Sequence, residues 1–281
     1  MKLTAKFYEI EQGSEAWLNL RSQLFTASEG ASWMIEEPKC KLTVDELKAE
    51  LSDLGIPFIK SASKAVLEAL IPDLSKFMGL SSVSEKARIA LIRRKMAMFT
   101  TEGQLRAAEA NRKLEFNFDI KRGNEIEPIA RQVYSDEMGF EVVETGFLAH
   151  ESCRFDAAGN PSHGFGCSPD GLIPDGDEWS HGLESKAPCP EKMMEWLDDG
   201  VLPSEHETQV HFSMAVSGLR RWDFIGYCPQ LPPLIVTTLW SEKTDRCLAA
   251  LKSLHANFLT YRAKLGKLGP VIVGEKMEVG V

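Results

Sequence analysis

Residues that can support metal-dependent chemistry are concentrated in the stretch 166–188, GCSPDGLIPDGDEWSHGLESKAP. Asp170 lies in a Ser-Pro-Asp-Gly turn, and a Glu-Ser-Lys triplet follows in a run with strand character. Residues i and i+2 of a strand point to the same face, so Glu184 and Lys186 are predicted to project side by side. The Gly- and Asp-rich segment 174–181 is predicted to be a turn that brings Asp170 back towards Glu184.

Two carboxylates and a lysine that converge in this way suit the hydrolysis of a phosphodiester bond. Hard oxygen ligands favour Mg²⁺ or Mn²⁺, which keep several waters and also bind a substrate phosphate. The lysine would orient or activate a water, or stabilise the charge that develops during the reaction. The alternative is that Asp170 belongs to an ordinary turn, and that Glu184 and Lys186 flank a small residue on an exposed strand.

The length and composition are those of an ordinary globular protein. A chain of 281 residues, 43% hydrophobic and 26% charged, suits one large domain or one domain with an insertion. Apolar runs stay below the roughly 18 residues of a membrane span, and the N-terminus lacks the apolar segment of a signal peptide. The six cysteines form no CxxC pair, which favours reduced thiols in a cytoplasm over a metal cluster or disulfides.

The charge distribution limits how the chain could bind nucleic acid. A net charge of −9 argues against a generic nucleic-acid-coating surface. It does not exclude a nuclease, because a metal site gathers carboxylates while basic residues cluster elsewhere. Ten basic residues do cluster, and they would either contact DNA or form solvated helix faces: Lys86, Arg88, Arg93, Arg94, Lys95, Arg106, Arg112, Lys113, Lys121 and Arg122.

The N-terminal region contains a possible seat for a phosphate group. A helix is predicted over 15–20 with Ser14 as its N-cap, and a second helix opens at 26–29. A helix N-terminus that carries the Ser28 hydroxyl suits a phosphate, and Arg21 would add a bidentate contact. The simpler alternative is that Ser28 only caps the helix and Arg21 pairs with an acid.

The segment from about 40 to 115 has a different, strongly helical character. Thr43 is predicted to cap a helix that ends near Gly55, and a second helix runs from Ser63 to Ile71. With its Leu-Gly-Ile-Pro joint, the 41–72 hairpin resembles the small SAP or HeH DNA-binding motifs, although such hairpins also serve as plain packing elements. The sequence up to residue 118 favours helices without indicating their partners.

The rest of the chain alternates between helices and strands. The predicted helices are 120–139, 190–197, 206–217 and 242–265, and the predicted strands include 141–150, 222–227 and 234–240. This order predicts an α/β (α+β) fold in which helices flank a mixed central sheet that carries the acidic cluster. Residues 266–281 are predicted to be a loosely attached tail.

Glu127, on the predicted helix 120–139, has two interpretations. Its carboxylate would bind a second metal ion or the water on such an ion. Alternatively, it forms an i,i+4 salt bridge with Arg131, which contributes only a few tenths of a kcal/mol, roughly, on a surface.

Four separated segments, in this order, resemble one nuclease family. They are EQGSEAWLNLRSQLFTASE at 11–29, RGNEIEPIAR at 122–131, CSPDGL with LESKAP within 167–188, and ETQVHFSM at 207–214. The chain is similar to the lambda-exonuclease or YqaJ-like recombinase branch of the PD-(D/E)xK nuclease superfamily. The resemblance covers most of 7–35 and 120–240 but not 40–115. It implies a single nuclease domain over 1–265 with a restriction-endonuclease-like core and a helical insertion.

The resemblance also implies roles for individual residues. Asp170, Glu184 and the Ser185 carbonyl would bind metal, Lys186 would be the catalytic lysine, and Glu127 would serve a second ion or its water. Further matched positions are Arg21, Ser28 and Ser168 for the terminal 5′-phosphate, Gln209 for a helical glutamine near the active site, and Lys192 near a basic position. Two departures stand out: the loop from Asp170 to Glu184 looks long, and His211 occupies a position where relatives can carry a second glutamine.

By this resemblance the protein would be a Mg²⁺-dependent 5′→3′ exonuclease, with Mn²⁺ as a substitute and two ions per site. It would degrade linear double-stranded DNA to mononucleotides and leave 3′ single strands for phage-type recombination. The resemblance further implies a ring-shaped homotrimer, a single-strand annealing protein as partner, and a phage or prophage gene expressed in a bacterial host. An acidic ring exterior around a basic channel would reconcile the charge of −9 with DNA binding.

Two other functions stay open on the sequence. An endonuclease or repair nuclease with the same core would cut closed circular DNA. A catalytically silent DNA-binding or scaffold protein would rely on the 41–72 hairpin and would be indifferent to replacement of Lys186.

Overall fold

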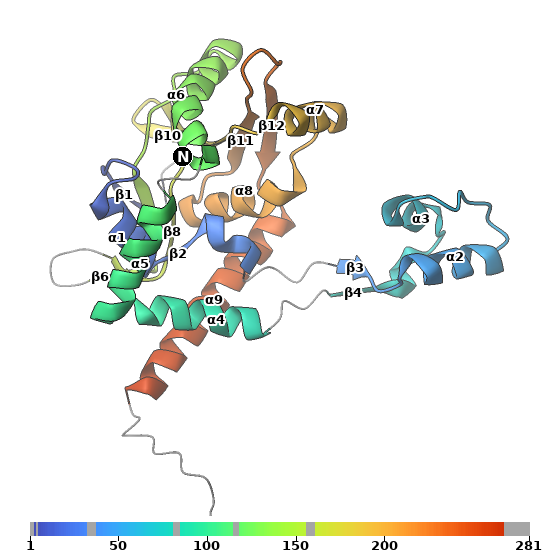
Figure 1. The fold of residues 1–281 in the computed structure, drawn as a ribbon, viewed down its shortest axis with the longest axis horizontal. Helices are drawn as coiled ribbons and strands as arrows, with labels where there is room; N and C mark the ends of the chain where they lie inside the picture. The colour runs from blue at the N-terminus through green and yellow to red at the C-terminus, as the bar shows by residue number, and fades with distance from the viewer. Residues whose placement is uncertain are drawn as a thin grey trace, which may run out of the picture. The chain divides into compact units, whose positions relative to one another are not determined.

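The chain folds into two compact units in the computed structural model, which describes residues 3, 5–32, 38–80, 85–114, 118–155 and 161–266. The larger unit comprises residues 1–34 and 88–281, and the smaller unit comprises residues 35–87. The elements of both are drawn in Figure 1. The smaller unit falls largely within the segment predicted to be an insertion.

The larger unit contains two four-stranded sheets. The first has the order β12-β11-β10-β9, formed by Leu234–Leu239, Arg221–Gly226, Glu178–Lys186 and Gly171–Asp175. The second has the order β1-β5-β8-β2, formed by Ala5–Tyr8, Phe147–His150, Phe165–Cys167 and Phe25–Thr26. Each sheet combines antiparallel pairs with one parallel pair, β10 with β11 and β2 with β8. The predicted mixed α/β fold is therefore confirmed.

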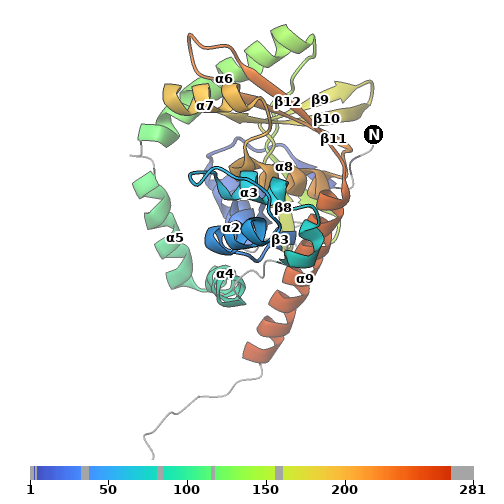
Figure 2. The same cartoon turned by 90° about the vertical axis from the view of Figure 1, so that its right-hand side faces the viewer.

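Two helices cover opposite faces of the first sheet. Helix α6 (Phe118–Met138) packs against Ile173 and Leu183, whereas α8 (Ser204–Ser217) packs against Leu172. Neighbouring strand residues face opposite sides, so Leu172 and Ile173 serve different helices. Helix α8 also contacts β5 and β8, and it therefore lies between the two sheets (Figure 2).

The remaining helices of the larger unit agree with the sequence expectations. They are α1 (Glu15–Gln23), α4 (Glu85–Ala97), α5 (Thr101–Leu114), α7 (Pro190–Asp199) and α9 (Glu242–Leu265), and a short β6–β7 pair joins Arg154–Phe155 to Pro161–His163. The predicted Ser14 cap is confirmed, because its Oγ accepts a hydrogen bond from the Trp17 amide at 3.3 Å. Gly139 ends α6 with φ +69°, a left-handed conformation that favours glycine.

Two local predictions are wrong. The helix expected at 26–29 is instead the end of β2 followed by a 3₁₀ turn, η1 (Ala27–Ser32). The strand expected over 141–150 is restricted to its last four residues, although Val143 forms an isolated bridge to Leu172. Of the predicted tail 266–281, all residues beyond 266 lie outside the described structure. Among the described helices, none is long and apolar enough to cross a membrane.

The smaller unit has a hydrophobic core of its own. It contains α2 (Val44–Asp53), α3 (Lys64–Leu70), the 3₁₀ turn η2 (Leu74–Phe77) and the antiparallel pair β3 (Pro38–Cys40) and β4 (Met78–Leu80). Its fully or largely buried residues are Cys40, Leu47, Leu51, Leu67 and Ile71. Thr43 and Glu46 form a capping box at the start of α2, which confirms the predicted helix start.

A buried polar network attaches α6 to the first sheet. The Tyr134 hydroxyl donates to Asp223 Oδ2 at 2.6 Å and lies 2.9 Å from His181 Nε2. Arg221 Nε donates to Asp223 Oδ1 at 2.9 Å. Because Tyr134 lies two helical turns from Glu127, this network fixes the helix that carries Glu127.

Replacing Tyr134 by phenylalanine is expected to lower the free energy of unfolding by about 1–3 kcal/mol, because Asp223 and His181 then lose a buried partner. Urea denaturation monitored by circular dichroism measures this loss. Tyr261→Phe is the matched control, since its hydroxyl only accepts an exposed contact from Arg93 at 3.4 Å. Equal effects of the two substitutions would contradict the prediction.

His163 is expected to make the larger unit less stable in mild acid. Its Nδ1 lies 2.8 Å from His255 Nε2, and burial lowers the pKa of His163 from 6.5 to about 4. At this site the folded state binds fewer protons than the unfolded state, so the contribution of His163 to stability is greatest above pH 6.5 and declines as the pH falls towards 4. Urea denaturation at pH 7.5 and 5 should show a smaller difference for His163→Gln than for the wild type. An unchanged difference would refute this assignment.

Candidate active site

The centre of the site is the hairpin of β9 and β10. Asp170 precedes β9, its amide donates to the Leu183 carbonyl at 3.1 Å, and its Oδ2 accepts from the Ser185 amide at 2.7 Å. The prediction that a turn within 174–181 brings Asp170 back towards Glu184 is confirmed, but the turn is much shorter than expected, and the expectation of a long loop between the two residues is wrong. The intervening residues pair as strands almost throughout, and only Gly176 and Asp177 form the turn.

Glu184 and Lys186 project from the same face of β10, as predicted. The Lys186 ammonium contacts Glu184 Oε1 and also donates to the Ser185 carbonyl at 3.0 Å. From α8, Gln209 Nε2 donates to the same Glu184 Oε1 at 2.5 Å. Glu184 is only 1% exposed, and its second oxygen, Oε2, is buried without a hydrogen-bond partner.

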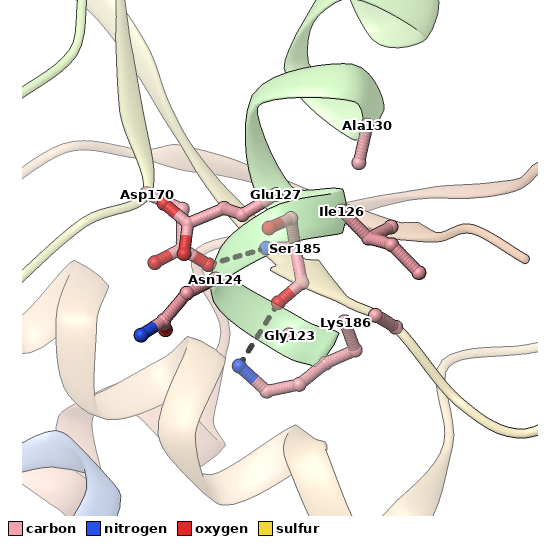
Figure 3. Close-up of a pocket in the computed structure, with 9 residues that line it drawn as sticks. Gly123, Asn124, Ile126, Glu127, Ala130, Asp170, Ser185 and Lys186 are labelled. Carbon is pink, nitrogen blue, oxygen red and sulfur yellow. Dashed lines mark hydrogen bonds between the residues drawn. The ribbon is translucent and has the colours of Figure 1, made fainter. Parts of the chain in front are cut away.

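Beside this hairpin lies a cavity of about 370 Å³. It is lined by Gly123, Asn124, Ile126, Glu127 and Ala130 of α6 and by Asp170, Ser185, Lys186 and Ala187 (Figure 3). Glu127 thus lies at the cavity, and it also forms the alternative i,i+4 salt bridge with Arg131 at 2.5 Å. The salt-bridge interpretation of Glu127 is therefore confirmed, and Arg131 Nη1 also reaches the Asp170 carbonyl at 3.3 Å.

The carboxylates of the site destabilise one another's charge. Burial raises the pKa of Glu184 to about 7, where Lys186 opposes the rise and Asp170 adds to it. Burial and Asp170 likewise raise the pKa of Glu127 to about 7. Burial lowers the pKa of Lys186, but Glu184 and Asp170 outweigh it and the pKa is raised overall. Crowded acidic groups of this kind are relieved when a cation binds between them.

These residues fit a hard divalent cation. Carboxylate oxygens of Asp170 and Glu184 and the Ser185 carbonyl are donors that suit Mg²⁺, and the buried Glu184 Oε2 has no hydrogen-bond partner of its own. In the described part of the chain, no group of three or more His, Cys, Asp or Glu side chains is close enough to enclose an ion. An ion held by two carboxylates and one carbonyl would keep several of its waters, as Mg²⁺ does.

A second cluster comprises Trp17, Arg21, Ser28 and Ser168, and it is here called the anion pocket after the phosphate-binding role that the sequence resemblance implies for Arg21, Ser28 and Ser168. Arg21 Nη2 donates to Ser28 Oγ at 2.7 Å, and its guanidinium lies 4.3 Å from the Trp17 ring centroid. Trp17 Nε1 donates to Ser168 Oγ at 2.9 Å. Burial lowers the pKa of Arg21, while Glu29, Glu184 and Asp170 oppose the change. Ser168 is two residues from Asp170, so the pocket adjoins the carboxylates.

Ser28 reaches this pocket from a different element than expected. The sequence placed it at a helix N-terminus, whereas it lies in the 3₁₀ turn η1. The Arg21 guanidinium donates to the Ser28 hydroxyl, and Glu29, Glu184 and Asp170 are the acidic groups that act on its charge.

Lys192 and His211 do not join the two clusters. Lys192 pairs with Glu195 at 3.0 Å and Glu205 at 3.5 Å. His211 is buried, and its Nδ1 lies 2.8 Å from Thr244 Oγ1, so it fastens α8 to α9. A histidine at this position therefore serves packing.

The basic residues of 86–122 lie in different environments. Arg106 forms an exposed pair with Glu102, as expected for a solvated face. That interpretation is wrong for Arg122, which donates to the Ala187 carbonyl at 2.5 Å, and for Lys95, which is buried. The side chains of Lys86, Arg112 and Lys113 lie outside the described structure.

Sequence reasoning missed the residues that hold Asp170 in place. Gln12 Nε2 donates to the Pro169 carbonyl at 2.9 Å, and Thr145 Oγ1 donates to the same oxygen at 3.0 Å. Gln12 also donates to the Thr145 carbonyl at 2.8 Å. The position of Gln12 and Trp17 inside the matched segment 11–29 was the available signal, whereas Thr145 carried none.

Comparison with known proteins places this chain in a class of viral recombinases. Residues 16–220 match the YqaJ-like viral recombinase domain, so the chain belongs to that family and the resemblance seen in the sequence is confirmed. No curated protein matches the chain.

Solved structures extend the fold comparison to most of the chain. The alkaline exonuclease LHK-Exo from Laribacter hongkongensis is 22% identical over 91% of this chain and 100% of its own, with a TM-score of 0.52. Its complex with dAMP has 23% identity over the same shares and a TM-score of 0.47. A phage-related exonuclease from Haemophilus somnus 129PT has 13% identity over 72% and 89% of the chains and a TM-score of 0.38. At 22% identity, the first of these shows a shared fold.

Proposed function

We propose that this protein is a Mg²⁺-dependent 5′→3′ exonuclease. It acts on linear double-stranded DNA, releases mononucleotides and leaves 3′ single strands for phage-type recombination. The observation that carries this proposal is the position of the anion pocket, which adjoins the carboxylate–lysine centre through the short segment Ser168–Asp170. A terminal phosphate held in that pocket would place a neighbouring phosphodiester at the carboxylates.

The residues in and around the hairpin would have different roles in metal binding and catalysis. Asp170, Glu184 and the Ser185 carbonyl would hold Mg²⁺, with Mn²⁺ as a substitute, and Glu127 would serve a second ion or its water. Bound ions of this kind supply Lewis-acid stabilisation of charge on the phosphate. Lys186 orients the attacking water or stabilises the charge that develops on the phosphate, and Gln209 fixes the Glu184 carboxylate.

The anion pocket sets the register of cleavage. The Arg21 guanidinium and the hydroxyls of Ser28 and Ser168 are suitable donors to a terminal 5′-phosphate. Fixing that phosphate positions the next phosphodiester for attack, so that each turnover removes one nucleotide. Lys192 would contact DNA only after it leaves its pairs with Glu195 and Glu205.

The proposal extends to the assembly and setting that the sequence resemblance implies. The chain would form a ring-shaped homotrimer around DNA and cooperate with a single-strand annealing protein in a bacterial cytoplasm. The smaller unit, with the SAP- or HeH-like hairpin at 41–72, would contact DNA or the annealing partner. Cross-linking that yields only monomers in solution would contradict the trimer.

The test uses a linear duplex with one 5′-phosphate end and one 5′-hydroxyl end, each strand carrying its own label. Closed circular plasmid is the control, and parallel reactions omit Mg²⁺. The proposal expects Mg²⁺-dependent loss from the phosphorylated end while the circle stays intact. A cut circle would instead indicate an endonuclease or repair nuclease, and no digestion with any metal would indicate a non-catalytic DNA-binding or scaffold protein.

A further inference from the structure

A buried lysine from α4 lies against the anion pocket. The side chain of Lys95 is 5% exposed, and its Nζ donates to the Arg21 carbonyl at 3.1 Å. The same nitrogen lies 2.9 Å from Glu29 Oε2. One ammonium group therefore joins the last turn of α1, which carries Arg21, to the 3₁₀ turn that carries Ser28 and Glu29.

Glu29 completes the connection on the Ser28 side. Its Oε2 accepts from the Thr26 amide at 3.1 Å and from the Thr26 hydroxyl at 3.2 Å. Its Oε1 lies 3.2 Å from Arg94 Nη2, an exposed contact. The Lys95–Glu29 pair thus fixes the backbone on both sides of the Arg21–Ser28 hydrogen bond.

Burying the Lys95 ammonium costs desolvation free energy. Burial lowers the pKa of Lys95, and Glu29 opposes the change. An apolar side chain of similar length would pack there without the desolvation cost. What an apolar side chain would lack is a pair of directed bonds that set the distance between α1 and η1.

We propose that Lys95 and Glu29 are positioning residues of the anion pocket, which hold Arg21 and Ser28 at the spacing that selects a terminal phosphate over a terminal hydroxyl. This inference rests on the proposed exonuclease function and makes its end selection depend on α4. Donors that are held in place bind an anion better than donors that must first be ordered. Loosening the pair therefore weakens phosphate selection without touching Asp170, Glu184 or Lys186.

The test measures binding in the absence of metal, so that it does not depend on activity. The full chain is titrated in EDTA against a fluorescent duplex that ends in a 5′-phosphate or a 5′-hydroxyl, and anisotropy reports the affinity. Lys95→Met removes the ammonium at similar length and should reduce the preference for the phosphate end by about tenfold or more. In Mg²⁺-dependent digestion it should raise KM and leave kcat close to the wild-type value. Arg93→Met, on the same helix, should keep the wild-type preference.

Two further variants separate positioning from general destabilisation. Lys95→Arg should retain much of the phosphate preference, because it keeps a positive charge near Glu29. Glu29→Gln should lose the preference. These two variants test the inference even if Lys95→Met fails to fold. In an Arg21→Gln background, Lys95→Met should have no further effect on the preference, because it acts through Arg21.

Three results would overturn the inference: a wild type without phosphate preference, an unchanged preference in Lys95→Met, or effects of Lys95→Met and Arg21→Gln that add in full. Loss of the preference in Lys95→Met without any Mg²⁺-dependent digestion by the wild type would support the inference while removing the exonuclease function.

Discussion

Replacement of Lys186 by methionine is expected to reduce nuclease turnover by about 10²–10³-fold, the usual effect of removing one preorganised electrostatic group. Methionine keeps most of the length of the side chain, so the hairpin should keep its shape. The Lys186 ammonium contacts Glu184 Oε1 and the Ser185 carbonyl, and it lines the cavity in which the substrate phosphate would lie. Initial rates of mononucleotide release from a 5′-phosphorylated duplex measure the effect.

The control for this substitution is Lys252→Met, which removes an exposed lysine of α9. It should digest DNA at the wild-type rate. Binding of the phosphorylated duplex in EDTA should be retained by Lys186→Met, because the anion pocket is intact. Wild-type turnover in Lys186→Met would exclude a catalytic role for this lysine and favour a non-catalytic protein.

Replacement of Glu184 by glutamine is expected to remove both metal binding and activity. The carboxylate is buried, its Oε2 has no hydrogen-bond partner, and an amide lacks the negative charge that favours Mg²⁺. Loss of several kcal/mol of charge stabilisation corresponds to a rate reduction of roughly 10³-fold or more.

A direct measure of this prediction is the thermal stability of the chain with and without metal. A ligand at 100 times its dissociation constant stabilises the folded state by about 2.7 kcal/mol, so Mg²⁺ or Mn²⁺ should raise the Tm of the wild type by about 5 °C or more. Glu184→Gln should show no such rise. Asp175→Asn, an exposed change at the far end of the same hairpin, should respond as the wild type does. A metal-induced rise that survives in Glu184→Gln would place the ion elsewhere.

The local features of this protein follow from its sequence. Side chains two residues apart on a strand share a face, so the proximity of Glu184 and Lys186 needed no tertiary information. Ser14 and Thr43 mark helix starts because a hydroxyl that accepts from a nearby backbone amide satisfies a donor the helix leaves unpaired. The order of elements, together with the matched segments, was sufficient for the fold class and the family.

Tertiary structure alone decided how the distant segments complete the site. The sequence of 170–184 is compatible with a long loop or with a hairpin. Only the pairing of β9 with β10 shows that the segment is a hairpin with a tight turn. The side chains of Gln12 and Thr145 both donate to the Pro169 carbonyl, and Trp17 donates to the Ser168 hydroxyl. These contacts form because the second sheet and α1 pack around Ser168 and Pro169. Lys95 has the sequence context of a solvated helix face. It is buried because α4 packs where the ammonium reaches Glu29 and the Arg21 carbonyl, and no local pattern encodes a contact between residues so far apart in the chain.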